Sequence, residues 1–152
     1  MREIRRWARL TAYCLLVALQ PLLTGCETPP PEAALREAAA ELESGLEGGD
    51  VGAVMDRLAA DFRYRDLDRK AAGRRLVGVF LRYPKRQVSF LNVQVSLDPV
   101  TLREAEVTFN ALVWGGRATL PEDADSFRVR SRWRDEGGDW VLVDLEARGL
   151  RE

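Results

Sequence analysis

The side chains that could do chemistry in this chain are carboxylates, guanidinium groups and thiols. The 152 residues include no histidine and two cysteines, Cys14 and Cys26. Without imidazole, neither His-based acid–base catalysis nor a His/Cys metal site is available. The sequence has no DxDxDG spacing of a calcium loop, and no GxxxxGK[ST], GxGxxG or GxSxG motif. We therefore expect no metal and no cofactor, which leaves single carboxylates, a row of arginines and one cysteine as candidates.

Cys26 lies at the end of a segment that has the form of an export signal. Residues 1–9 hold four arginines and one glutamate, and residues 10–23 hold no charge. A basic leader followed by a short apolar run is typical of a secretory signal peptide. Leu23-Thr24-Gly25-Cys26 resembles the bacterial lipobox, in which the peptide is cut before the cysteine and the cysteine is acylated.

The lipobox resemblance implies a division of the chain. Residues 1–25 would be the lipoprotein signal peptide, residues 26–31 a lipidated, proline-rich tether, and residues 32–152 one domain. Cys14 would leave with the signal, so the remaining 127 residues would have neither a free thiol nor a disulfide. Glu27 is not the aspartate that commonly retains such lipoproteins at the inner membrane. We expect a protein anchored by lipid to the periplasmic face of the outer membrane of a Gram-negative bacterium.

The charge of the remaining chain argues against a nucleic-acid partner. The signal holds four of the 23 basic and one of the 24 acidic residues, so the rest carries a net charge of −4. Nucleic-acid binding needs a basic patch that neutralises phosphates. One basic stretch does occur near the third expected helix, with Arg69, Lys70, Arg74, Arg75, Lys85 and Arg86. It is interpreted as a solvated helix face, with contact to anionic lipid as the alternative.

The period of the apolar residues changes once along the domain. Apolar residues first recur at helical spacing, with Gly48-Gly49 as a stop and Asp50 as a cap; after Pro84 they alternate with polar residues. These patterns predict helices over residues 32–47, 50–58 and 68–84, a short extended piece over 61–66, and strands over 89–97, 103–114, 127–133 and 141–147. The fold class is therefore α+β, with three helices packed on an antiparallel sheet of four to six strands.

The expected inward side chains follow from these periods. They include Leu58 and Leu76 from the helices, and Leu91, Val93, Val141, Val143 and Leu145 from the strands. The opposite side of residues 103–114 holds Thr108, Asn110, Leu112 and Trp114. Apolar side chains on that side predict either a contact with a partner protein, such as an envelope protein or a second copy of the chain, or a lining of a pocket.

The order of these elements, and above all "EGGDVGAVMDRLAADFRYRD" at residues 47–66, resembles the nuclear transport factor 2-like superfamily, which includes SnoaL-like proteins and steroid isomerases. The resemblance covers nearly all of residues 32–148. It implies a curved sheet wrapped around helices into a cone with a pocket at its open end. Leu42, Tyr64, Asn110 and Trp114 are the candidates for lining that pocket.

The steroid isomerases of this superfamily offer a comparison residue by residue. The catalytic base of those enzymes would correspond to Asp66, five positions after Asp61. Their two oxyanion donors would correspond to Leu42 and Val129, which cannot donate a hydrogen bond. Because one such donor contributes on the order of 2.7–4 kcal/mol to the barrier, a chain that lacks both would be a weak catalyst. Asp66 could instead cap the third helix or pair with a neighbouring arginine.

A row of arginines marks the strand at residues 127–133 and the hairpin after it. Strict alternation and a five-residue loop at 135–139 predict that Arg130 faces Asp144, Arg128 faces Glu146, Arg134 faces Trp140 and Arg132 faces Leu142. On that register the row is mostly self-neutralised. Arg132 and Arg134 remain candidates for binding surface anions such as phosphate head groups.

These observations support three functional hypotheses. The leading one is a periplasm-facing binding or adaptor lipoprotein that holds a small apolar ligand in the cone or docks an envelope protein on its sheet. The second is an isomerase or hydratase that uses Asp66. The third is a pilotin-like assembly factor, which rests only on size and the anchor.

Overall fold

The computed structural model describes residues 29–116 and 123–150. The expected signal peptide, Cys14 and the expected lipidation site Cys26 lie outside the described residues. No helix within the described ranges is both long and apolar enough to cross a membrane.

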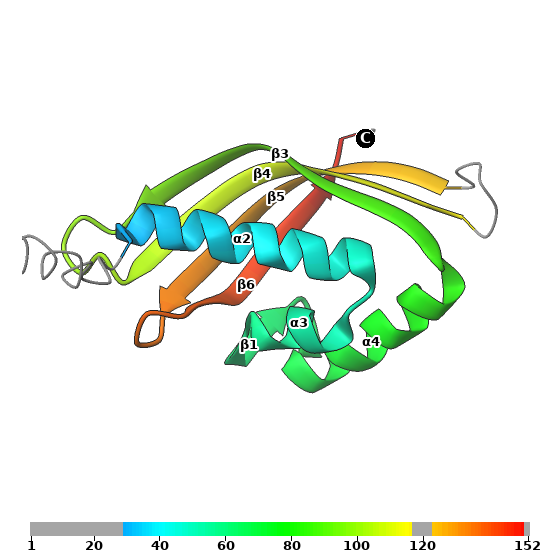
Figure 1. Ribbon diagram of the computed structural model, residues 1–152, viewed down its shortest axis with the longest axis horizontal. Helices are drawn as coiled ribbons and strands as arrows, with labels where there is room; N and C mark the ends of the chain where they lie inside the picture. The colour runs from blue at the N-terminus through cyan, green and yellow to red at the C-terminus, as the bar shows by residue number, and fades with distance from the viewer. Residues whose placement is uncertain (1–28, 117–122, 151–152) are drawn as a thin grey trace, which may run out of the picture.

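The described residues form an α+β fold in which helices cover one side of a single curved sheet (Figure 1). The helices are α2 (Pro31–Gly48), α3 (Val51–Asp56) and α4 (Arg69–Arg82); the strands are β1 (Leu58–Tyr64), β2 (Leu67–Asp68), β3 (Lys85–Leu97), β4 (Glu104–Gly116), β5 (Asp123–Asp135) and β6 (Trp140–Gly149). The strand order is β2-β1-β6-β5-β4-β3, and the sheet has six strands. The predicted fold class is confirmed. One pairing differs from a purely antiparallel sheet, because β1 runs parallel to β6.

The glycine stop and the aspartate cap between α2 and α3 are where the sequence predicted them, but the end of α3 is not. Gly49 ends α2 with φ of 72°, and the Asp50 carboxylate caps α3 by accepting the N–H of Ala53 at 3.0 Å. The prediction that this helix reaches Leu58 is wrong, because Leu58 is already the first residue of β1. The backbone N–H of Leu142 donates to the carbonyl of Arg57 at 2.7 Å, so the chain is drawn into the sheet at this point.

The core lies between α2 and the inner face of the sheet, which is the face that the helices cover. The predicted stripe of α2 is buried, with Leu35, Ala38, Ala39 and Leu42, and so are the alternating residues Ala105, Val107, Phe109 and Ala111 of β4. Ser131 is buried too; its hydroxyl donates to the Val107 carbonyl at 2.8 Å and accepts the Trp133 Nε1–H at 3.0 Å. These bonds satisfy the polar groups that this core contains.

The edge strand β3 departs from strict alternation at a β-bulge. Asn92 has φ of 57°, and the pairing with β4 shifts between Leu91 and Gln94. Phe90 therefore packs against the core, whereas Leu91, predicted to face inward, is 49% exposed on the outer face. The side chain of Glu43 on α2 accepts the N–H of Phe90 at 2.9 Å, so the helix satisfies part of this sheet edge.

α4 is less buried than α2. Its N-terminus is capped by Asp68, which accepts the Ala71 N–H at 2.7 Å, but none of its residues is fully buried. The helix packs mainly on α3, β1 and β2 rather than on the long strands. Its inner side lines two cavities together with residues of the sheet.

Arg86, at the start of β3, joins the ends of two helices. Its Nε–H donates to the carbonyl of Leu46 near the C-terminus of α2 at 2.9 Å, and its Nη1–H donates to the carbonyl of Tyr83 after α4 at 2.8 Å. The guanidinium also lies over the Phe80 ring, 4.4 Å from its centroid. A Cβ at Gly49 would overlap this guanidinium, so the junction requires glycine there.

We expect Gly49→Ala to lower the free energy of unfolding by about 2 kcal/mol or more, because alanine is strained in the left-handed conformation and its Cβ would displace Arg86. Gly48→Ala is the matched control, since a Cβ there meets no atom within 4 Å and alanine favours a helix. Urea unfolding followed by circular dichroism measures both. Equal stabilities of the two variants would contradict the role given to Gly49.

Candidate functional site

Two neighbouring chambers lie between α4 and the inner face of the sheet. The wide chamber has a volume of about 570 Å³. Its walls are mainly apolar side chains of α4 and of strands β3 to β6: Leu76, Val79, Phe80, Val88, Phe90, Phe109, Ala111, Val113, Phe127, Val129 and Leu145. The core side chains of the sheet thus form one wall, and the loosely packed α4 forms the other.

The narrow chamber, of about 320 Å³, continues toward β1. It is lined by Leu42, Val54, Leu58, Phe62, Tyr64, Leu67, Ala72 and Leu142, and it shares Leu46, Arg75, Leu76, Val79 and Leu145 with the wide chamber. Because five residues line both spaces, we treat the two chambers as one candidate site. Both volumes lie in the range of small-molecule sites.

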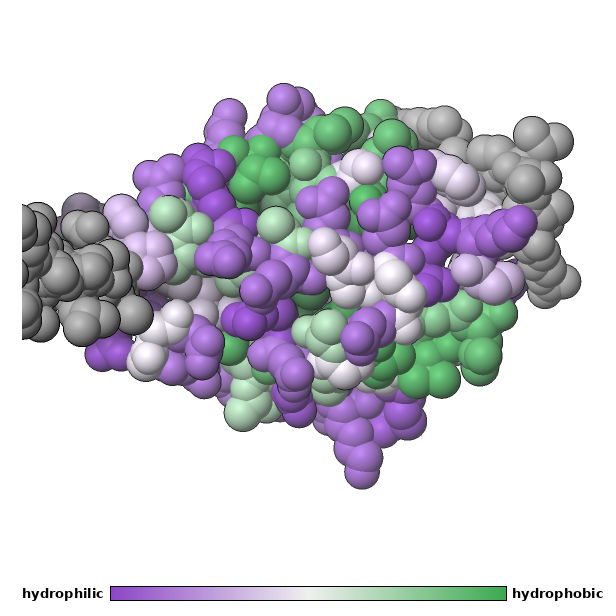
Figure 2. Space-filling model, in the orientation of Figure 1, coloured by the Kyte–Doolittle hydropathy of each residue, from purple (hydrophilic) through white to green (hydrophobic). Residues whose placement is uncertain are grey.

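The apolar lining of the site extends to an exposed surface on α4. Val79, which lines both chambers, is 40% exposed, and Val77 and Leu81 of the same helix are exposed as well. Figure 2 shows apolar surface gathered at the lower right, over the C-terminal part of α4. Of these three side chains Val79 belongs to the chamber lining, and an incompletely buried apolar side chain there favours a bound molecule.

Three charged residues line the chambers among the residues that the structure describes. They are Arg75, which lines both, and Arg86 and Asp125, which line the wide one. Arg86 is already engaged by the Leu46 and Tyr83 carbonyls. Asp125 is the single carboxylate of the described lining, so this described lining has one more positive than negative side chain.

Most of the predicted pocket residues line this site. Leu42 and Tyr64 line the narrow chamber. Trp114 lines the wide one, and its Nε1–H donates to Gln87 Oε1 at 2.8 Å. Val129, expected at an oxyanion position, also lines the wide chamber. Asn110 lines neither chamber; it lies on the outer face, paired with Leu91 and Arg128 of the neighbouring strands.

Asp66 lies away from the site. It is exposed in the turn between β1 and β2, next to Arg65, whose φ is 55°. It lines neither chamber, and the helix cap that it could have supplied comes from Asp68 instead. Within the part of the chain that the structure describes, no group of His, Cys, Asp and Glu side chains could hold a metal ion.

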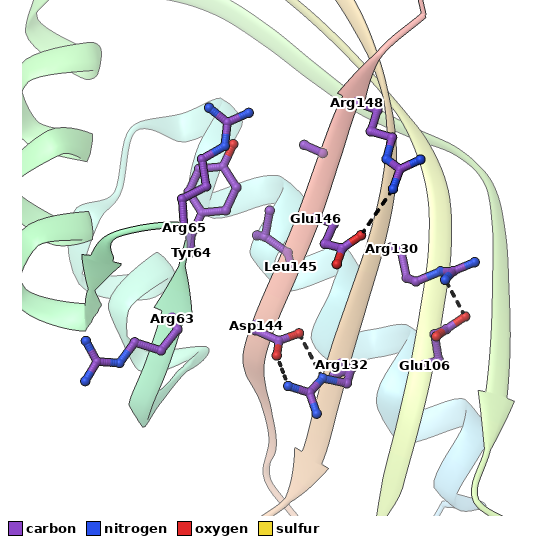
Figure 3. A pocket seen from close by; sticks show the side chains of 11 residues that line it. Arg63, Tyr64, Arg65, Glu106, Arg130, Arg132, Asp144, Leu145, Glu146 and Arg148 are labelled. Carbon is purple, nitrogen blue, oxygen red and sulfur yellow. Dashed lines mark hydrogen bonds and ion pairs between the residues drawn. The ribbon is translucent and has the colours of Figure 1, made fainter.

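The arginine row lies on the outer face, but with a register different from the predicted one (Figure 3). The pairing of β5 with β6 shifts between Arg132 and Trp133, so Arg132 faces Asp144, Arg130 faces Glu146 and Arg134 faces Val141. A bulge at Val143 causes the shift, because it places Leu142 opposite Trp133 in the core. Val141 is buried as well, but it lies opposite Arg134. The four predicted pairings are therefore wrong: Arg130 with Asp144, Arg128 with Glu146, Arg132 with Leu142 and Arg134 with Trp140.

Both anion candidates of the row have carboxylate partners. Arg132 forms a bidentate ion pair with Asp144, and this contact raises the pKa of the Arg132 guanidinium. Arg134 reaches Asp61 at 2.9 Å and Glu136 at 2.6 Å. These contacts neutralise the groups that were expected to bind surface anions, and the Asp61 contact ties β1 to the β5–β6 hairpin.

A shallow groove of about 620 Å³ separates β1 from the end of β6 on this side (Figure 3). Arg63 and Arg65 line it from β1 and its turn, opposite Glu146 and Arg148. Arg65 lies over the ring of Tyr64, 5.3 Å from its centroid. Most residues that line the groove are charged, and its three acids pair with arginines, so it fits an apolar ligand less well than the chambers do.

Comparison with solved structures identifies the fold of this chain. Solved structures similar to this chain share the nuclear transport factor 2-like fold, an open curved sheet around helices. An NTF2-like protein from Cytophaga hutchinsonii aligns with a TM-score of 0.65 and 12% identity, over 78% of this chain and 98% of that chain. A putative dehydratase of the NTF2-like family from Streptomyces avermitilis aligns with a TM-score of 0.66 and 14% identity, over 82% and 100%.

A third similar structure is Bd1075 from Bdellovibrio bacteriovorus, with a TM-score of 0.69 and 9% identity. The alignment covers 78% of this chain but 41% of Bd1075, so this chain spans well under half of that protein. The sequence matches no protein-family model and no curated protein. At these identities the likeness establishes the NTF2-like fold of this chain and nothing about its ligand or reaction.

The three charged residues of the site, Arg75, Arg86 and Asp125, were not predicted as site residues, and Arg75 is the one that lines both chambers. It stands in a basic stretch and was interpreted as part of a solvated helix face. It also lies three residues after Ala72 and four before Val79, on the apolar stripe of α4. That spacing places Arg75 on the side of the helix that faces the chambers. It was not used because Arg75 was grouped with the neighbouring basic residues.

We expect Asp61→Asn to lower the melting temperature at pH 7, because the hydrogen bond from Arg134 lowers the pKa of Asp61. A carboxylate with a lowered folded-state pKa contributes stability above its unfolded pKa of about 4, and this contribution is lost as pH falls through the lowered value. The difference between variant and wild type should thus shrink below about pH 4. Thermal melts across this range measure it.

Asp66→Asn is the control for the Asp61–Arg134 contact, since within the described residues Asp66 makes no hydrogen bond or ion pair. It should melt close to the wild type at both ends of the pH range. A pH-independent loss in Asp61→Asn would show that the Arg134 contact is not its source.

Proposed function

We propose that the protein is a lipid-anchored, periplasm-facing binding protein that holds a small, mainly apolar ligand in its cone. The observation that carries the proposal is the pair of apolar chambers between α4 and the inner face of the sheet. A ligand there would cover Val79 and the neighbouring inner side of α4, which the fold leaves partly exposed. Each apolar Å² removed from water contributes about 25 cal/mol, so even a small ligand would gain affinity from this burial.

The membrane anchor is supported by the sequence before the domain. Leu23-Thr24-Gly25-Cys26 follows a basic and then uncharged leader, and α2 begins at Pro31. An anchor on Cys26 would hold the cone within a few residues of the membrane surface. A binding protein in that position would meet apolar molecules that partition into the membrane.

Docking of an envelope protein or a second copy on the outer face is a second candidate. Leu91 and Leu112, on adjacent strands, are 49% and 42% exposed on that face. We do not propose isomerase or hydratase chemistry for Asp66, because this carboxylate lines neither chamber.

Binding in the cone predicts different effects for two neighbouring valines of α4. Val79→Lys places an ammonium group in the lining of both chambers, four residues after the like-charged Arg75, and should weaken binding of the neutral fluorescent probe N-phenyl-1-naphthylamine at least roughly tenfold, because burying a charge without a partner is costly. Val77→Lys, at a position of similar exposure that lines neither chamber, should bind like the wild type. A wild type that binds no apolar probe would contradict the proposed function.

Lipidation of Cys26 is tested by labelling. The full chain, produced with its own leader in a Gram-negative host, should incorporate labelled palmitate, and Cys26→Ser should incorporate none. Cys14→Ser, which changes the other cysteine of the sequence, should label like the wild type. Labelling that survives in Cys26→Ser would rule out this anchor.

A further inference from the structure

We infer that the ligand of the cone is an amphiphilic anion, with one carboxylate or phosphate head group bound by Arg75 and an apolar chain in the two chambers. This inference rests on the proposed function and names the chemical class of its ligand. It starts from the position of one cation in an otherwise apolar site.

Arg75 stands where the two chambers meet. It lines both of them, together with Leu46, Leu76, Val79 and Leu145. Arg75 is exposed to solvent although it lines both chambers, as is common for a long side chain with an apolar stem and a charged end. An elongated ligand that fills both chambers must pass this side chain.

The guanidinium of Arg75 is available for a ligand. Among the described residues it makes no hydrogen bond and no ion pair. The other chamber cation, Arg86, is bound by the backbone carbonyls of Leu46 and Tyr83, and Arg132 and Arg134 of the outer face are bound by carboxylates. Arg75 thus differs from these arginines, which have structural partners.

The charge and shape of the site favour an anion over a cation or a neutral molecule. The described lining of the wide chamber includes two arginines, Arg75 and Arg86, and one carboxylate, Asp125. A guanidinium presents parallel N–H donors that match a carboxylate or a phosphate. The walls beyond it offer apolar side chains, so one polar end and one apolar chain satisfy the whole site.

The adjacent arginine supplies a matched control. Arg74 belongs to the same helix but lines a different groove, between α4, α3 and β1, together with Met55, Arg69 and Val77. Replacing Arg74 or Arg75 by glutamine removes the same charge from neighbouring positions. A general electrostatic effect would appear in both variants, and a head-group contact only in Arg75→Gln.

The test compares dodecanoate, dodecyl phosphate and uncharged dodecanol by isothermal titration calorimetry, below their aggregation concentrations. The wild type should bind at least one of the two anions roughly tenfold or more tightly than dodecanol, as expected for a charge-assisted contact. Arg75→Gln should lose this preference and keep its affinity for dodecanol. Arg74→Gln should keep the preference, and Asp125→Asn should strengthen anion binding.

The outcomes separate the two proposals. If all three probes bind the wild type equally, or if Arg75→Gln keeps the preference for anions, the inference about Arg75 is overturned while binding in the cone stands. If none of the three binds and N-phenyl-1-naphthylamine does not bind either, the proposed function itself fails. Which anion binds more tightly distinguishes a carboxylic acid from a phosphate ester as the natural head group.

Discussion

The arrangement of this domain depends on Arg86, which holds the ends of α2 and α4 to the start of β3. Its two hydrogen bonds to the Leu46 and Tyr83 carbonyls satisfy acceptors where helices end, and its charge opposes the negative end of the α2 dipole. Gly49 leaves room for the guanidinium. Gly115 of β4 allows the Tyr83 ring to approach, since a Cβ there would lie 3.0 Å from it. α4 is thereby fixed at its C-terminal end without being packed onto the long strands.

The chambers exist because α4 is fixed at its C-terminal end but does not pack onto the long strands. The bulges in β3 and β6 bend the sheet around α2, which fills one part of the inner face, while α4 rests mainly on α3, β1 and β2. The remaining inner face is lined by Phe90 and Phe109, whose rings lie 4.2 Å apart. On the outer face, carboxylates pair with Arg130, Arg132, Arg134 and Arg148. Within the described residues, the apolar site thus has one guanidinium without a hydrogen bond or ion pair, that of Arg75.

The sequence predicted those features that depend on local periodicity. The α2 stripe, the Asp50 cap and the alternation in β4 were correct because neighbouring residues decide them. The bulges at Asn92 and Val143 were not visible, since a single extra residue in a ladder is fixed by the partner strand. The predicted cross-strand partners of Arg130 and Arg134 were wrong for the same reason, because the bulge in β6 changes the register of the β5–β6 pair. The site residues Leu42, Tyr64 and Trp114 came from the family resemblance, whereas Arg75 required knowing which side of α4 faces the chambers.

The most direct test of the account is a crystal structure of the protein with dodecanoate that carries a bromine on its terminal carbon. Anomalous scattering from the bromine locates the end of the chain independently of the rest of the map. The account predicts the bromine inside a chamber, near apolar side chains such as Phe62 or Phe109, and the carboxylate at Arg75. A bromine on the outer face of the sheet near Leu91 and Leu112, with both chambers free of ligand, would contradict it.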